Sequence, residues 1–322
     1  MLSLLRSNQP IAWLILPMTA ALLWFLDFSF DTPFVENSTA SSLIAHTFSL
    51  RLPLWTHWPL IFLNAALVNY LLSLHELQPQ RNNFAGWLML VLFWLVSPSA
   101  SASIVLLAMP FFTLGLTILL GVYRQNDAGA AYFNAAFLAS VGSLFLTYGS
   151  ISLLLILLSL LYTRTPNWRE ITLLILGAAF PPLLFLAISF LIDSEVVFHS
   201  LDSATSQLPG LTLLLVVSIG ALTIVGLLKL LGTFSTSSNK SKNSKAVLMI
   251  NAGGLIVCAA LLYPSSPLGA LYLSFLPAVL FIQAIFTAQK KFLWHDLLFA
   301  AFVAFAIWYW ATVVNGPMII PQ

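Results

Sequence analysis

Charged side chains are scarce in this sequence. Only 7% of its 322 residues are charged, with 12 Lys and Arg against 10 Asp and Glu, whereas ordinary globular domains contain about 25%. Hydrophobic residues make up 60% of the chain, and its mean hydropathy is +0.98. So few charges do not cover the surface of a soluble globule of this size. The composition therefore excludes a soluble protein and predicts an integral membrane protein.

Cysteine and the common catalytic motifs are also nearly absent. The single cysteine, Cys258, excludes an internal disulfide and any C-x-x-C metal or redox motif. The sequence contains no G-x-G-x-x-G, Walker A, H-E-x-x-H or G-x-S-x-G motif. The formal charge of +2 is too small to indicate nucleic-acid binding. Function must therefore be inferred from the placement of a few polar residues.

Long apolar runs are what the sequence has instead. A helix needs about 20 mostly apolar residues to cross a bilayer. The predicted fold is all-α, a polytopic transmembrane bundle of eleven spans, near residues 10–27, 57–74, 84–97, 102–123, 129–148, 150–163, 170–192, 209–232, 246–263, 267–288 and 293–314. We interpret the first run as a retained helix, because no signal-peptide cleavage site follows it closely.

Breaks between the runs predict how the chain is organised. The short breaks Ser97-Pro98-Ser99 and Tyr148-Gly149-Ser150 indicate tight helical hairpins, or else broken or re-entrant segments. A basic, low-complexity stretch, residues 235–245 (STSSNKSKNSK), predicts a flexible cytoplasmic linker. It would separate a transmembrane core, residues 1–234, from a three-span group, residues 246–322.

The placement of basic residues predicts the orientation. With the N-terminus in the cytoplasm, all Lys and Arg residues except Arg51 fall on the cytoplasmic side. Cytoplasmic loops of membrane proteins are enriched in Lys and Arg in this way. The C-terminus, residues 315–322, is then expected outside.

The longest predicted loop, residues 27–56 on the outer side, contains the first candidate site. Asp27 and Asp31 are four residues apart, so they share one face if the first helix continues past the bilayer. A carboxylate at the bilayer edge loses part of its hydration, which makes it a candidate general base or metal ligand. The alternative interpretation is that these acids are solvated helix-end residues beside the interfacial anchors Trp55 and Trp58.

Two further loops contain candidate binding residues. The second outer loop has residue types suited to a divalent metal but no ligand spacing that identifies a site: Asp193, Glu195, His199 and Asp202. In the cytoplasmic loop TRTPNWRE, Arg164 and Arg169 flank Trp168 and are candidates for binding a lipid phosphate. Solvated loops, the latter with an aromatic anchor, are the alternative interpretation.

Few polar residues lie inside the predicted spans. We expect them to hydrogen-bond between helices; they are Asn64, Asn69, Asn134, Asn251 and Gln283. No span carries an Asp, Glu, Lys or Arg near its centre, which weighs against a pump or antiporter. The halves show no convincing inverted repeat, which weighs against a secondary transporter.

Several short segments resemble an uncharacterised family of bacterial multi-pass inner-membrane proteins, and the resemblance covers nearly the whole chain. They are MLSLLRSNQ at residues 1–9, YFNAAF at 132–137, NWRE at 167–170, Leu176-Gly177 with Pro181, and Lys290 to Asp296. The resemblance implies the bacterial cytoplasmic (inner) membrane as the location.

The first seven spans also resemble the GT-C superfamily of polyprenyl-phosphate-sugar-dependent glycosyltransferases. Those enzymes have an acid just after the first span, a long first outer loop and short helical hairpins. The resemblance implies that Asp27 or Asp31 serves as general base or metal ligand. This chain has Asp27-Phe28-Ser29-Phe30-Asp31 where adjacent acidic pairs are common in the family. It also lacks a large outer C-terminal domain, so a non-catalytic relative is an alternative.

The resulting functional hypothesis is transfer of a sugar from a polyprenyl-phosphate-linked donor on the outer side. Asp27 or Asp31 would activate the acceptor hydroxyl, and Arg51 or His57 would bind the phosphate. The cofactor is unknown, with a divalent metal as the candidate. One alternative is a non-catalytic subunit of an envelope biogenesis or secretion assembly, with a membrane protein partner. Another is a transporter for a lipid-linked substrate, with a lumen lined by Asn64, Asn69 or Asn134.

Overall fold

The computed structural model describes residues 16–23, 44, 56–75, 77, 83–96, 103–123, 127–163, 165–193, 210–234, 238–263, 267–286, 300–305, 307, 308 and 312. Within these ranges every regular element is a helix, and no strand occurs. The prediction of an all-α protein is confirmed. Predictions that concern other residues, including Asp27, Asp31 and Arg51 of the loop 27–56, lie outside the described ranges.

The helices fall where the apolar runs predicted them. Their bounds are α4 His57–Leu74, α5 Phe84–Val96, α6 Ser103–Leu120, α7 Gly129–Phe145, the 3-10 helix η3 Thr147–Ser150, α8 Ile151–Thr163, α9 Trp168–Leu191, α10 Gly210–Gly232, α11 Asn239–Leu262 and α12 Pro267–Phe286. Residues 16–23 and 300–305, inside the first and last predicted spans, are also helical. The helix η3 lies at the predicted second hairpin break, and α7 and α8 contact each other on either side of it.

Four helices are long and apolar enough to cross a bilayer, as judged by length and composition among the described residues. They are His57–Leu74, Trp168–Leu191, Asn239–Leu262 and Gly269–Phe286. Shorter apolar helical stretches lie at Phe84–Leu95, Ile104–Leu120, Gly129–Phe145, Tyr148–Thr163 and Val216–Gly232. The structure thus supports a membrane protein, while the count of eleven spans stays a prediction.

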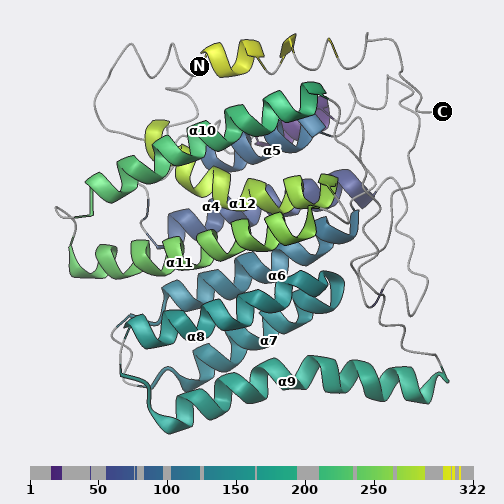
Figure 1. Ribbon diagram of the computed structural model, residues 1–322, viewed down its shortest axis with the longest axis vertical. Helices are drawn as coiled ribbons and strands as arrows, with labels where there is room; N and C mark the ends of the chain where they lie inside the picture. The colour runs from purple at the N-terminus through teal and green to yellow at the C-terminus, as the bar shows by residue number, and fades with distance from the viewer. Residues whose placement is uncertain are drawn as a thin grey trace.

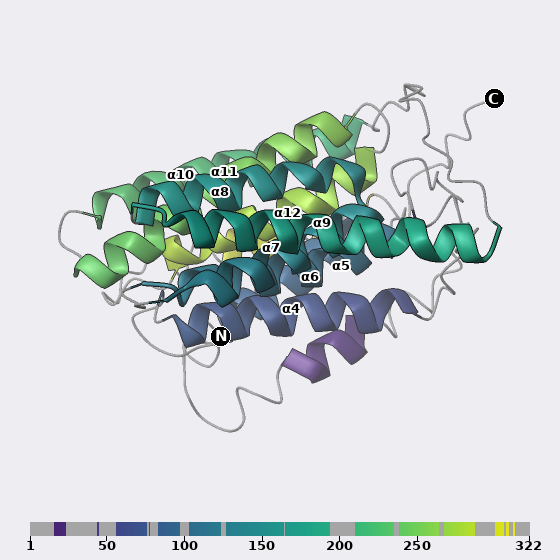
Figure 2. The ribbon, with the colours of Figure 1, turned by 90° about the horizontal axis from the view of Figure 1, so that it is seen from below.

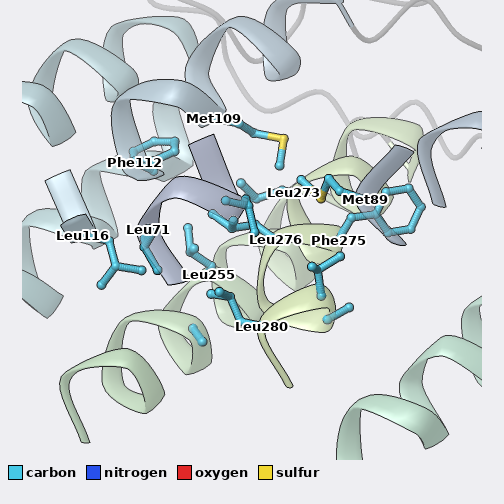
Figure 3. Packing of buried hydrophobic residues seen from close by; sticks show 14 of the residues in the cluster. Leu71, Met89, Met109, Phe112, Leu116, Leu255, Leu273, Phe275, Leu276 and Leu280 are labelled. Atoms are coloured by element: carbon cyan, nitrogen blue, oxygen red, sulfur yellow. The ribbon is translucent and has the colours of Figure 1, made fainter. Parts of the chain in front are cut away.

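The helices lie side by side in one bundle (Figures 1 and 2). In Figure 1 α9 lies at one edge, where it packs mainly against α7, while α10 lies towards the opposite edge and packs against α12. Between them, α5 and α12 are buried along most of their length, because both helices are apolar on every face. Figure 3 shows part of this core, with Met89 from α5 close to Phe275 and Leu273 from α12.

Glycine residues bring both edge helices into backbone contact with the bundle. A Cβ atom added at Gly177 of α9 would overlap the backbone of Phe133 on α7. A Cβ atom added at Gly226 of α10 would overlap the backbone of Phe281 on α12. Such small residues allow close helix packing where lipid supplies no hydrophobic driving force. The Leu176-Gly177 segment singled out in the sequence therefore has a packing role.

The predicted linker at residues 235–245 is wrong in its second half. Helix α11 begins at Asn239, and Ser238 caps it by accepting a hydrogen bond from the Ser241 amide. The serine, asparagine and lysine residues of this segment indicated a low-complexity linker. A serine directly before the first turn of a helix is also an N-cap signal. The following helices are not a separate layer, because α11 packs on α8 and α12 packs on α5.

We predict that Gly226→Ala destabilises the protein and that Gly220→Ala, on the same helix, does not. The added methyl at position 226 must push α10 away from the α12 backbone, which costs about 1–3 kcal/mol. A Cβ atom at Gly220 meets nothing within 4 Å, so alanine there adds only helix propensity. Thermal unfolding of both variants in detergent tests this. Equal unfolding midpoints for the two variants would contradict the α10–α12 contact.

Candidate functional site

Two of the six predicted site residues, His57 and Arg169, lie within the described residues. Asp27, Asp31, Arg51 and Arg164 lie outside them. The site must therefore be built from the two residues that are placed and from the polar groups around them.

His57 is buried inside the bundle. It is the first residue of α4, its side chain is only 6% exposed, and its ring lies 6.2 Å from the ring of Tyr272 on α12 and 6.5 Å from that of Trp58. Phe93 from α5 and Phe275 from α12 pack against Tyr272 in turn. We refer to these five residues, contributed by three helices, as the His57 cluster.

Within the part of the chain that the structure describes, neither ring nitrogen of His57 forms a hydrogen bond, and both are buried. A neutral imidazole carries one N–H donor and one acceptor nitrogen. A buried polar group without a partner costs about 1–3 kcal/mol, and such groups in native proteins often have a binding or catalytic role. His57 was expected, as an alternative to Arg51, to bind the phosphate of the donor, and that role stays a prediction. The side chain lies inside the bundle, because α4 begins at this residue and packs against α5.

Arg169 lies at the start of α9, at the end of the bundle opposite to His57. Its Nη1 atom is 3.4 Å from Oδ2 of Asp127, which precedes α7, and both side chains are largely exposed. The neighbouring Glu170 carboxylate accepts a hydrogen bond from the backbone N–H of Asn167 at 3.4 Å. The NWRE segment thus stabilises the beginning of α9. The exposed ion pair between Arg169 and Asp127 contributes little to stability. Phosphate binding by Arg169 stays a prediction.

The basic residues that the structure describes gather at one end of the bundle. This end is formed by the C-termini of α4, α6, α10 and α12 and the N-termini of α9 and α11, and its bases are Arg169, Lys229, Lys240, Lys242 and Lys245. Lys229 Nζ donates to the Ile285 carbonyl near the end of α12 at 2.9 Å. His75, which follows α4, donates through Nε2 to the Thr117 carbonyl of α6 at 2.8 Å. We call this the His75 end and the opposite one the His57 end.

Sequence reasoning did not single out His75 as a contact between helices. The residue closes α4 and holds it to α6, but the acceptor is a backbone carbonyl, which leaves no trace in the sequence. Its position directly after a long apolar run was the available signal.

Two asparagines that a transporter hypothesis needs are sealed between helices. Asn64 is fully buried, and its Nδ2 donates to the Leu106 carbonyl of α6 at 3.0 Å. Asn69 donates to Oδ1 of Asn83 at 2.7 Å. Asn134 is exposed on the outer surface of α7. Asn64 and Asn69 therefore connect helices and do not line a lumen.

The described residues contain no group of three His, Cys, Asp or Glu side chains that could hold a metal ion. Of the four metal-type residues in the second outer loop, only Asp193 is described; it lies at the end of α9 with a left-handed φ of 56°. The predicted divalent-metal site at Asp27 or Asp31 lies outside the described residues.

No protein-family model, curated protein or solved structure matches this chain.

We predict that the stability of the protein falls as the pH drops below the ordinary histidine pKa of about 6.5, and that His75 contributes to the fall. Burial lowers the pKa of His75 and the nearby charge of Lys240 lowers it further, although the hydrogen bond to Thr117 opposes them. The unfolded chain then binds the proton more readily than the folded chain, so acid favours unfolding.

The measurement is the unfolding midpoint between pH 8 and 5 for the wild type and for His75→Gln. We expect a shallower pH dependence in the variant, and Lys240→Ser should also weaken it. Identical slopes in all three proteins would contradict this assignment.

Proposed function

We propose that this protein is a multi-pass protein of the bacterial cytoplasmic membrane that transfers a sugar from a polyprenyl-phosphate-linked donor at its His57 end. The observation that carries the proposal is the buried imidazole of His57, which has no hydrogen-bond partner among the described residues. It lies where the predicted outer loop 27–56 joins the bundle.

The orientation follows from the distribution of charge. The bases that the structure describes lie at the His75 end, and the basic side of a membrane protein normally faces the cytoplasm. The His57 end then faces outwards, as does the acidic loop that contains Asp27 and Asp31. Lipid-linked sugars would reach the site from the outer leaflet.

The chemistry requires a base and a group that binds phosphate. The acceptor hydroxyl gives its proton to Asp27 or Asp31 while its oxygen bonds to the anomeric carbon of the sugar. The bond from that carbon to the phosphate oxygen breaks, and polyprenyl phosphate leaves with the electron pair. A phosphate oxygen at the His57 cluster would accept the imidazole N–H hydrogen bond, and Arg51 would neutralise its charge.

A second candidate is a non-catalytic subunit of an envelope assembly, and the position of α9 favours it. This helix packs mainly on α7 and leaves large apolar side chains exposed along its length, including Ile175, Leu183 and Phe190. A transmembrane helix of a partner would cover that face. Purification in mild detergent would then recover a stoichiometric partner, and a lone monomer would count against this candidate.

The test of the main proposal uses two histidines at opposite ends of α4. We predict that His57→Gln weakens binding of polyprenyl phosphate to the detergent-solubilised full chain at least tenfold, as measured by native mass spectrometry. His75→Gln is the matched control and should bind like the wild type. Asp27→Asn and Asp31→Asn should retain binding, but at least one of them should abolish sugar transfer at normal membrane expression.

Two results would contradict the proposal. One is equal binding by the two histidine variants, which would remove His57 from the site. The other is unchanged transfer in both aspartate variants, which would remove the proposed base.

A further inference from the structure

A small cavity with two polar walls lies between α6, α7, α8 and α11, away from the His57 cluster. Its volume is about 20 Å³. Phe112 and Leu116 of α6, Ala139 of α7 and Leu255 of α11 contribute apolar walls. Its polar lining comes from Asn251 of α11 and Ser152 of α8, and both side chains are more than nine-tenths buried.

The amide of Asn251 is oriented by its hydrogen bonds. Its Nδ2 donates to the Val247 carbonyl at 2.8 Å and to Ser159 Oγ at 2.9 Å. A carbonyl can only accept, so the nitrogen and oxygen of this amide cannot be exchanged. Ser159 Oγ itself donates to the Leu155 carbonyl and therefore accepts from the amide. Within the described residues, Asn251 Oδ1 forms no hydrogen bond.

Ser152 has a similar spare capacity. Its hydroxyl donates to the Gly149 carbonyl in the 3-10 helix η3. A hydroxyl has one donor and two acceptor lone pairs, so Ser152 Oγ can still accept hydrogen bonds. Two residues that line the cavity from different helices, Asn251 and Ser152, thus each have an oxygen that can accept a further hydrogen bond.

We propose that this cavity binds one water molecule, which donates one hydrogen bond to Asn251 Oδ1 and the other to Ser152 Oγ. Roughly 10–15 Å³ is enough space for a water molecule, and a buried water typically makes two to four hydrogen bonds. The available volume is sufficient for one water but not for a larger ligand. A dry cavity would leave a buried amide oxygen without a partner, at a cost of about 1–3 kcal/mol.

The water would add a hydrogen-bonded link between helices next to the break between α7 and α8. The Phe112 ring packs closely against Gly142 of α7 and Gly149 of η3, so α6 contacts the turn directly. Asn251 holds α11 to α8 through Ser159. A water shared by Asn251 and Ser152 would join α11 to the first turn of α8, next to this break.

Radiolytic hydroxyl-radical footprinting of the full chain in detergent tests the proposal, because radicals form at bound waters and oxidise the side chains beside them. Phe112 and Leu255 should be oxidised at least fivefold faster than Phe275 and Leu276, which are residues of the same types in the packed core (Figure 3). In Asn251→Leu the oxidation of Phe112 and Leu255 should fall to the level of these controls.

Ser152→Ala provides a second variant that removes one acceptor and leaves the contact between Asn251 and Ser159 in place. Oxidation of Phe112 should fall at least twofold in this variant, with the controls unchanged. Oxidation of Phe112 and Leu255 at control rates in the wild type would show a dry cavity and overturn the proposal. Wild-type rates in both variants would overturn the assignment of Asn251 and Ser152 as its ligands.

Discussion

Hydrogen bonds between buried polar side chains and neighbouring helices are the interactions on which this bundle depends. Asn64 holds α4 to α6, Asn251 holds α11 to α8, and the Ser140 hydroxyl holds α7 to the Ala178 carbonyl of α9. Each such bond contributes about 0.6–2 kcal/mol in a membrane. The hydrogen bond has a greater effect on which packing register two helices adopt. Two apolar helices can slide or rotate against each other with little change in free energy. One polar contact per pair makes a single register favourable.

Close backbone approach is the second constraint, and it acts together with the hydrogen bonds. Gly177 lets α9 reach the α7 backbone, one residue from the carbonyl of Ala178 that Ser140 binds. Gly226 does the same for α10 and α12, which Lys229 then joins at the Ile285 carbonyl. Each edge helix is therefore held by a glycine contact with a polar bond close to it. The contacts at Gly226 and Lys229 fix α12 against α10, and α12 places Tyr272 beside His57.

The helices themselves were predictable, whereas the contacts between them were only partly so. The long apolar runs and the short breaks between them predicted the helices from α4 through α12, and most helix ends were correct to within a few residues. This was possible because the length of an apolar run alone identifies such helices. Asn251 was expected to bond across helices, but its partner Ser159 was not identified, since many serines are equally small and polar. The start of α11 was misplaced because local composition outweighed the N-cap signal of Ser238. The depth of His57 depends on tertiary packing, which no local pattern encodes.

The two ends of the bundle differ in chemistry, and the functional proposal rests on that difference. Among the described residues, bases collect at the His75 end, while the His57 end holds an unpaired imidazole and the exposed Asp193. The most direct test is labelling of single cysteines in a Cys258→Ala background with a membrane-impermeant maleimide. Asp193→Cys should react in intact cells, and Asn239→Cys should react only after the membrane is opened. Reaction of both positions from the same side, or the reverse pattern, would contradict the account.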